Sequence, residues 1–278
     1  MLWMHRLETV KDMTREQLRD YLQFYRDLGF HTIYKADMAK RIEPSIKPAK
    51  PAEPKAAGND PIVVPMVFSS ETNASLFEIA ELPGLAPQND TLDTIRLDIG
   101  DCKRCRLCET RMSIVFGSGN EQAKVVFVGE GPGADEDEQG VPFVGRAGQL
   151  LTQMIDNTAA KEGIPISRKD VYICNVVKCR PPENRTPLPD EMATCGQFLY
   201  RQLTTIKPKA ICALGATAMK ALLNTKEGIT KVRGQWRKWN DIPVMITYHP
   251  SYLLRQYNQQ ARREAWEDLK TLFHYVYD

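Results

Sequence analysis

The sequence lacks any apolar run that approaches the ~18–20 residues of a membrane-spanning helix. Its first residues also lack the pattern of a secretory signal peptide, because His5 and Arg6 are followed closely by further charged residues. Both absences favour a cytoplasmic protein. Thiols stay reduced in that compartment, so we expect the seven cysteines to act as ligands or catalytic groups rather than as disulfides.

A strong excess of charge is missing as well. The 278 residues carry a net charge of +2, which is too little to require a nucleic-acid partner. The basic residues are unevenly spread, because seven lysines and arginines stand between Lys231 and Arg263 against the acid Asp241. Such a stretch could follow a phosphate backbone or form an ordinary solvated surface.

The first ~90 residues differ in composition from the rest, and we find no internal repeats. The spacing of apolar residues over Thr14–Gly29 predicts an amphipathic helix, which could dock on the main domain or bind a partner. Prolines recur between Glu43 and Pro65 and indicate a semi-rigid linker. We therefore divide the chain into an N-terminal helical segment (1–42), a Pro-rich linker (43–90) and a main domain (91–278).

The main domain is organised around the stretch from Lys124 to Leu151. An apolar run at Val125–Val128 predicts a buried strand, and a sharp turn follows at Gly129, Gly131 and Gly133, where backbone N–H groups can approach a ligand. A second turn, Gly145–Gly148, opens a helix. Between the turns stand the acids Asp135–Glu138 and Phe143. They could line a pocket for a flat polar ring, or they could be a solvated loop and a core phenylalanine.

Three more strand–helix pairs follow. Apolar runs predict strands at Val171–Val177, Ala210–Leu214 and Pro243–Thr247, and helices are predicted at Pro189–Thr205, at Gly215–Leu223 and at the carboxyl end. This alternation is typical of α/β proteins with a mainly parallel sheet between helices. Ligands bind beyond the carboxyl ends of such strands, where the glycine turn, Asn175 and His249 all fall.

The cysteines suggest a metal centre. Cys102, Cys105 and Cys108 form C-x2-C-x2-C, Cys179 ends the second strand, and Cys195 falls on the buried face of the next helix. The spacing suits a four-thiolate site for zinc or for an iron–sulfur cluster and does not choose between them. We expect two other cysteines, which stand within apolar strands, to be small buried hydrophobic residues: Cys174 and Cys212.

Histidine is scarce, with four in the chain. His249 follows a predicted strand and shares a sheet edge with the glycine turn. A lone histidine is more often structural, but an imidazole at this edge could donate a hydrogen bond to a leaving group that gains negative charge.

Together these motifs resemble the family-4 uracil-DNA glycosylases, the iron–sulfur members of the uracil-DNA glycosylase superfamily. The resemblance runs from about Asp98 to Lys270 and excludes the first ~90 residues. Its matching motifs stand in the right order: Gly129–Gly133 (GEGPG), Pro142–Gly145 (PFVG), Asn175–Arg185 (NVVKCRPPENR), Val232–Gly234 (VRG) and His249–Ser251 (HPS).

The resemblance implies a four-stranded parallel sheet flanked by helices. It also implies a [4Fe-4S] cluster, mainly structural, on Cys102, Cys105, Cys179 and Cys195, whereas family members need not have a cysteine at Cys108. The expected substrate is uracil-containing DNA in a prokaryotic cytosol. We expect a monomeric base-excision-repair enzyme that hydrolyses the N-glycosidic bond of uracil and leaves an abasic site. The N-terminal extension could tether a repair or replication protein.

The residues suit this chemistry, for which the nucleotide must leave the base stack. Phe143 would stack on the flipped uracil, and the amide of Asn175 would read its Watson–Crick edge. His249 would stabilise uracil O2 as the bond breaks, together with backbone N–H groups of the turn that contains Gly131 and Gly133.

Three further residues are expected to meet the DNA. Leu253 would wedge into the gap that the flipped nucleotide leaves in the duplex. Arg233 and Arg255 would hold phosphates.

The resemblance leaves the water-positioning residue open. Other branches of the superfamily use a carboxylate or amide at the position of Gly131, which has no side chain. Glu130, Glu136 and Asn184 are the nearby candidates. We expect a mainly dissociative reaction in which the Glu136 carboxylate stabilises an oxocarbenium-like sugar. A uracil-crosslinking branch uses a histidine after the second strand, and residues 178–190 contain none, so we expect ordinary turnover without a stable adduct.

Two other functions compete with this one. A non-enzymatic iron–sulfur protein that binds DNA or senses redox state would explain the cysteines and the basic stretch, but would leave His249 and Phe143 without a role. A dinucleotide-dependent oxidoreductase with a structural zinc would need an acid at the end of the second strand, and that strand leads into Asn175 and Lys178 instead.

Overall fold

The computed structural model describes residues 14, 19, 89–255 and 258–278. The predicted helix over Thr14–Gly29 and the Pro-rich linker lie outside these residues, apart from a few isolated positions. The division of the chain into three segments therefore stays a prediction. Within the described ranges, no helix combines the length and the apolar character needed to cross a membrane.

A six-stranded sheet forms the centre of the domain, in the order β1-β3-β2-β4-β6-β5. Its inner strands are parallel, as the sequence predicts: β2 (Val125–Gly129), β3 (Tyr172–Asn175), β4 (Ala210–Leu214) and β6 (Ile242–Thr247). Every residue of β2, β3 and β4 is buried, which explains why these strands are continuous apolar runs.

Two short antiparallel strands extend the edges of this parallel core. β1 (Ser118–Gly119) pairs with β3, and β5 (Trp236–Trp239) pairs with β6. Sequence reasoning missed both. β1 is too short to show a period, and β5 has two exposed basic residues between its tryptophans instead of an alternating pattern.

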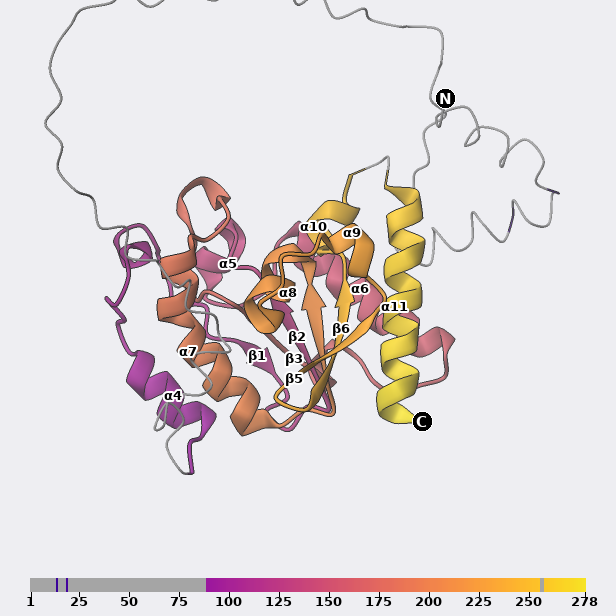
Figure 1. Ribbon diagram of the computed structural model, residues 1–278, viewed down its shortest axis with the longest axis horizontal. Helices are drawn as coiled ribbons and strands as arrows, with labels where there is room; N and C mark the ends of the chain where they lie inside the picture. The colour runs from indigo at the N-terminus through magenta and orange to yellow at the C-terminus, as the bar shows by residue number, and fades with distance from the viewer. Residues whose placement is uncertain (1–13, 15–18, 20–88, 256–257) are drawn as a thin grey trace, which may run out of the picture.

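Helices cover both faces of the sheet (Figure 1). One face packs against α4 (Leu92–Ile99), α7 (Pro189–Ile206) and α8 (Gly215–Leu223), and the other against α6 (Arg146–Lys161) and α11 (Gln259–Tyr277). Alternate residues of β2 serve the two cores, because Val126 and Val128 face the first set of helices while Val125 and Phe127 face the second. This arrangement confirms the predicted α/β sandwich.

The remaining elements are short. They are the helices α5 (Ala134–Gln139), α9 (Ile229–Val232) and α10 (Pro250–Leu253) and the 3-10 turns η2 (Arg106–Glu109), η3 (Arg168–Asp170) and η4 (Pro182–Asn184). The acidic run that could have been a loop forms α5, because acids in a first turn interact favourably with the helix dipole. The helix ends at Gly140, whose φ of 70° is the left-handed conformation that glycine adopts easily.

Candidate active site

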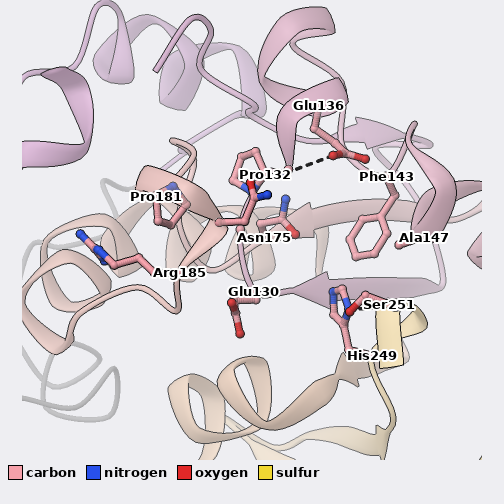
Figure 2. A pocket seen from close by; sticks show the side chains of 13 residues that line it. Glu130, Pro132, Glu136, Phe143, Ala147, Asn175, Pro181, Arg185, His249 and Ser251 are labelled. Atoms are coloured by element: carbon pink, nitrogen blue, oxygen red, sulfur yellow. Dashed lines mark hydrogen bonds between the residues drawn. The ribbon is translucent and has the colours of Figure 1, made fainter. Parts of the chain in front are cut away.

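A cavity of about 270 Å³ lies at the carboxyl ends of β2, β3 and β6. Figure 2 shows the side chains that surround it. Its lining includes all the residues predicted to bind or act on the substrate: Glu130, Gly131, Gly133, Glu136, Phe143, Asn175, Asn184 and His249. The convergence expected from the strand ends is therefore present.

Asn175 lies at the centre of this pocket (Figure 2) and ends β3. The residue is 1% exposed, yet neither Oδ1 nor Nδ2 of its amide has a hydrogen-bond partner. A buried amide without partners costs free energy, so its retention in a pocket wall points to a ligand that supplies both an acceptor and a donor. A Cβ on Gly129 would come within 2.4 Å of the amide oxygen, which explains the glycine there.

An aromatic plate forms another wall. The ring of Phe143 lies 5.6 Å from that of His249, centroid to centroid, with 38° between the planes. Phe143 has a φ of 55°, an unusual backbone for a bulky residue. Arg168 holds this backbone, because its guanidinium donates to the carbonyl of Pro142 at 2.8 Å and to that of Gly148 at 3.4 Å.

His249 precedes α10 with its ring partly open to the pocket. Its Nδ1 accepts a hydrogen bond from the backbone N–H of Ser251 at 3.2 Å, and the Ser251 hydroxyl lies 2.8 Å from the same nitrogen. Burial lowers the pKa of His249 to about 4. The ring is therefore neutral at pH 7, and Nε2 carries the proton as a hydrogen-bond donor.

Glu136 joins the two glycine turns. Its Oε1 accepts from the N–H groups of Val144 and Gly145, both at 2.9 Å, and its Oε2 accepts from Gly133 at 3.0 Å. This carboxylate therefore fixes the spacing between the turn after β2 and the loop that carries Phe143. The sequence predicted a carboxylate at the pocket but not this bracing.

Glu130 is anchored differently, because the hydroxyl of Thr217 on α8 donates to its Oε2. Thr217 stands 87 residues further along the chain, so sequence spacing gave no signal for this contact.

The loop after β3 forms the opposite side of the pocket. Asn184 has a φ of 56°, and its Oδ1 accepts from Nε of Arg180 at 2.8 Å. Arg185 forks onto the fully buried Glu191 at 2.6 and 2.8 Å and lowers the pKa of that carboxyl. The ion pair anchors the loop to the start of α7.

A second, smaller pocket is lined by Cys102, Cys105, Cys179 and Cys195. Arg104 donates to Sγ of Cys102 at 3.7 Å, Arg111 donates to Sγ of Cys179 at 3.6 Å, and the backbone N–H of Lys178 donates to Sγ of Cys195 at 3.3 Å. The two strand cysteines are fully buried, as predicted: Cys174 and Cys212.

The thiol chemistry of this pocket suits a cationic centre. Burial raises the pKa of Cys179 to about 12 and that of Cys195 to about 11, so free thiols there are neutral and become thiolates when a metal shares their charge. Among the residues that the structure describes, no three His, Cys, Asp or Glu side chains gather as a metal ion requires. The common pocket and the N–H groups directed at sulfur are the features that fit a thiolate-bound cofactor.

More than half of the chain matches a known protein family. The family described as the uracil DNA glycosylase superfamily matches residues 116–270. The chain belongs to the uracil DNA glycosylase superfamily. A protein of Thermotoga maritima named Type-4 uracil-DNA glycosylase is 46% identical over 185 residues, which are 66% of this chain and 93% of that protein. A protein of Archaeoglobus fulgidus with the same name is 42% identical over 191 residues, 66% of this chain and 92% of that protein.

A further relative marks another branch of the uracil DNA glycosylase superfamily. A Type-5 uracil-DNA glycosylase of Pyrobaculum aerophilum is 32% identical over 146 residues, which are 49% of this chain and 64% of that protein. The resemblance drawn from the motifs is thereby confirmed at the level of the superfamily, with several Type-4 proteins among the relatives.

Three residues that the sequence predicts to contact DNA do not line the cavity around Asn175: Leu253, Arg233 and Arg255. Leu253 is 1% exposed and packs in the core beside α6 and α11, so it cannot enter a duplex without leaving that core. Arg233 is paired with Asp268 and lies 3.9 Å from Glu264, which engages its guanidinium inside the protein. Arg255 is exposed, with its guanidinium 5.9 Å from the ring centre of Tyr252. Their predicted roles stay predictions.

Proposed function

We propose that this chain hydrolyses the N-glycosidic bond of uracil in DNA and leaves an abasic site. The observation that carries the proposal is the buried, unpartnered amide of Asn175 in a pocket bordered by Phe143 and His249. The names of the Type-4 relatives agree with it. A non-enzymatic iron–sulfur protein is not favoured, because it leaves this amide and the His249 donor without a ligand.

Recognition of uracil would depend on Oδ1 and Nδ2 of Asn175, which have no other hydrogen-bond partner. The base must leave the stack to reach the pocket. Uracil offers O4 to Nδ2 and its N3–H to Oδ1 of Asn175, whereas cytosine presents the opposite donor and acceptor in the same orientation. Phe143 would stack on the flipped ring and exclude water from its face.

Bond cleavage would depend on His249. Negative charge develops on uracil O2 as the C–N bond breaks, and the Nε2–H of the neutral imidazole can donate a hydrogen bond to this oxygen. The loss of one such donor typically lowers the rate by ~10²–10³. Uracil departs as an anion with the electron pair of the broken bond, water then adds to the positively charged sugar carbon, and the proton that this water loses balances the later protonation of the uracil anion through solvent.

The carboxylates would act on the sugar side. We retain the proposal that Glu136 stabilises positive charge on the sugar, while its hydrogen bonds to Gly133, Val144 and Gly145 hold it in place. Glu130 and Asn184 line the same pocket and remain the candidates for positioning the water.

We also propose that Cys102, Cys105, Cys179 and Cys195 hold a [4Fe-4S] cluster. The four cysteines line one pocket, as a shared thiolate-bound cofactor requires, and the choice of a cluster over zinc follows from the motif resemblance. When bound, the cluster would supply a covalent link between the segment after α4, the loop after β3 and α7. Cys108 does not line the pocket and is not assigned as a ligand.

The test is uracil excision by purified protein on a labelled oligonucleotide with one uracil, with abasic sites revealed by alkali. Thymine and unmodified cytosine oligonucleotides serve as controls, and His249→Ala is run alongside. Uracil-dependent cleavage that His249→Ala loses is the expected result. No cleavage by protein that contains iron would overturn the proposal.

A further inference from the structure

Lys178 is a buried side chain that the chemistry above does not use. It follows Asn175 of the base pocket by three residues, lines the cysteine pocket beside Cys179, and is 0% exposed. Burying an ammonium group is costly unless hydrogen bonds compensate for the lost water. A residue of this kind is retained when its donors hold something in place.

The amino group of Lys178 connects two elements. Nζ donates to the main-chain carbonyl of Asn175 at 2.8 Å and to Oε1 of Gln202 at 2.6 Å. Gln202 lies on α7, seven residues after Cys195 and so on the same side of that helix. Gln202 is itself fixed, because its Nε2 donates to the carbonyl of Phe116 at 2.9 Å.

The backbone of Lys178 is held as well. Its N–H donates to Sγ of Cys195 at 3.3 Å, and its carbonyl accepts from the N–H of Val115 at 2.8 Å. The side chain therefore extends from a fixed point back to the end of β3.

Asn175 needs such support because its amide makes no hydrogen bond of its own. The main chain must set the direction of the side chain. On one side, residue 175 is in register with Gly129 of β2, and the next N–H, from Val176, donates to the carbonyl of Gly129 at 2.9 Å. On the other side, the carbonyl of Asn175 is held by Lys178.

We propose that Lys178 is a positioning residue for base recognition: its Nζ holds the main-chain carbonyl of Asn175, so that the free amide is aimed before the base arrives. The proposal rests on the proposed excision of uracil. It adds a residue that touches neither the base nor the sugar. Its effect comes from preorganisation, because a displacement of about 1 Å at a reacting site can lower the rate ~10²-fold.

The test compares Lys178→Met with Gln202→Met. Lys178→Met keeps an unbranched side chain and removes the donor to Asn175, whereas Gln202→Met disturbs the same buried network and leaves that donor in place. Single-turnover excision from uracil DNA, iron content, visible absorbance, melting temperature and affinity for abasic-site DNA are measured for both. We expect both variants to melt earlier, and only Lys178→Met to lose about 100-fold in excision rate. Iron content and abasic-site affinity should match the wild type in both.

Three outcomes would overturn the proposal. Excision by Lys178→Met at the wild-type rate, or with no greater loss than Gln202→Met, shows that the lysine is structural. Loss of iron in parallel with the rate shows that it serves the cysteine pocket rather than Asn175.

Lys178→Gln, which keeps a shorter donor, should give an intermediate rate and replaces Lys178→Met if that variant does not fold. Failure of the proposed function is distinguishable, because wild-type protein would then excise no uracil, which overturns both.

Discussion

Ser251 donates its backbone N–H to Nδ1 of His249 at 3.2 Å, and this bond decides which ring nitrogen carries the proton. With Nδ1 occupied as an acceptor, the neutral ring keeps its proton on Nε2. The sequence motif HPS therefore supplies a donor and the residue that sets its tautomer within three positions. The proposed role of His249 depends on this neutral form.

The pH dependence of excision should reveal that form. Burial lowers the pKa of His249 from 6.5 to about 4. We expect the single-turnover rate to persist through pH 6.5 and to fall only as the pH nears about 4, because protonation of Nδ1 removes the acceptor for Ser251. The free energy of unfolding should change with pH in the same direction. The stabilisation from the neutral, buried His249 ring is complete above pH 6.5 and is lost as the pH falls toward the folded-state pKa of about 4. A rate that drops around pH 6.5 would contradict the assignment.

The inner strands and long helices could be predicted because their signals are local. Ala210–Leu214 and Gly215–Leu223 were predicted with the observed bounds, since an apolar run followed by a helical period reports its own burial. The edge strands β1 and β5 could not be predicted in this way. They exist because β3 and β6 offer them an edge to pair with, and that edge is absent from the local sequence.

Gly129 tests the close packing at the base of the pocket. A Cβ at this position would lie 2.4 Å from Oδ1 of Asn175 and 2.6 Å from the ring of Phe143. We expect Gly129→Ala to displace both groups and to lower uracil excision by about 100-fold. The matched control is Gly228→Ala, because a Cβ at Gly228 would meet no atom within 4 Å. Equal excision by the two variants would show that the pocket tolerates the displacement.

Glu136→Gln separates bracing from charge. The amide would set an N–H group against the backbone donors of Gly133 or of Val144 and Gly145, where the carboxylate now accepts. Hydrogen bonds to charged groups are worth about 1.5–3 kcal/mol, so we expect urea unfolding to show a loss of that order together with slower excision. Glu138→Gln, on the exposed side of the same helix, is the control. Full stability with slow excision would assign Glu136 to the sugar charge alone, full turnover would exclude the role at the sugar, and full turnover with full stability would exclude both roles.

The sequence indicated which residues line the pocket, but not which residues hold them in position. All the predicted substrate residues line one pocket because motifs at the ends of parallel strands must converge. Thr217, which holds Glu130, and Lys178, which holds Asn175, act through contacts that only the fold creates. A threonine on a helix, or a lysine beside a cysteine, shows no sequence pattern that indicates such a partner.

The cysteine assignment predicts a selective loss of iron. Cys195→Ser removes a thiol that lines the cysteine pocket, and Cys108→Ser removes one that does not. We expect purified Cys195→Ser to contain little iron and to lack the visible absorbance of a cluster, while Cys108→Ser keeps both, as measured by iron analysis and absorption spectra. Zinc in the wild-type protein, or equal iron loss in the two variants, would refute the proposed ligand set.

In α10, Leu253 lies in the core and Tyr252 lies at the surface. Leu253 is 1% exposed among apolar neighbours, whereas Tyr252 is 37% exposed and close to Arg255. We expect Leu253→Ala to lower the free energy of unfolding by about 2–5 kcal/mol, because it leaves a cavity. Tyr252→Ala, at an exposed position of the same helix, should lower the free energy of unfolding much less. Urea unfolding measures the stability of each variant, and fluorescence of a 2-aminopurine next to the uracil measures whether the duplex opens. If Leu253→Ala is fully stable yet fails to open the duplex, Leu253 does not stabilise the core, and the result would support the wedge that the sequence predicts.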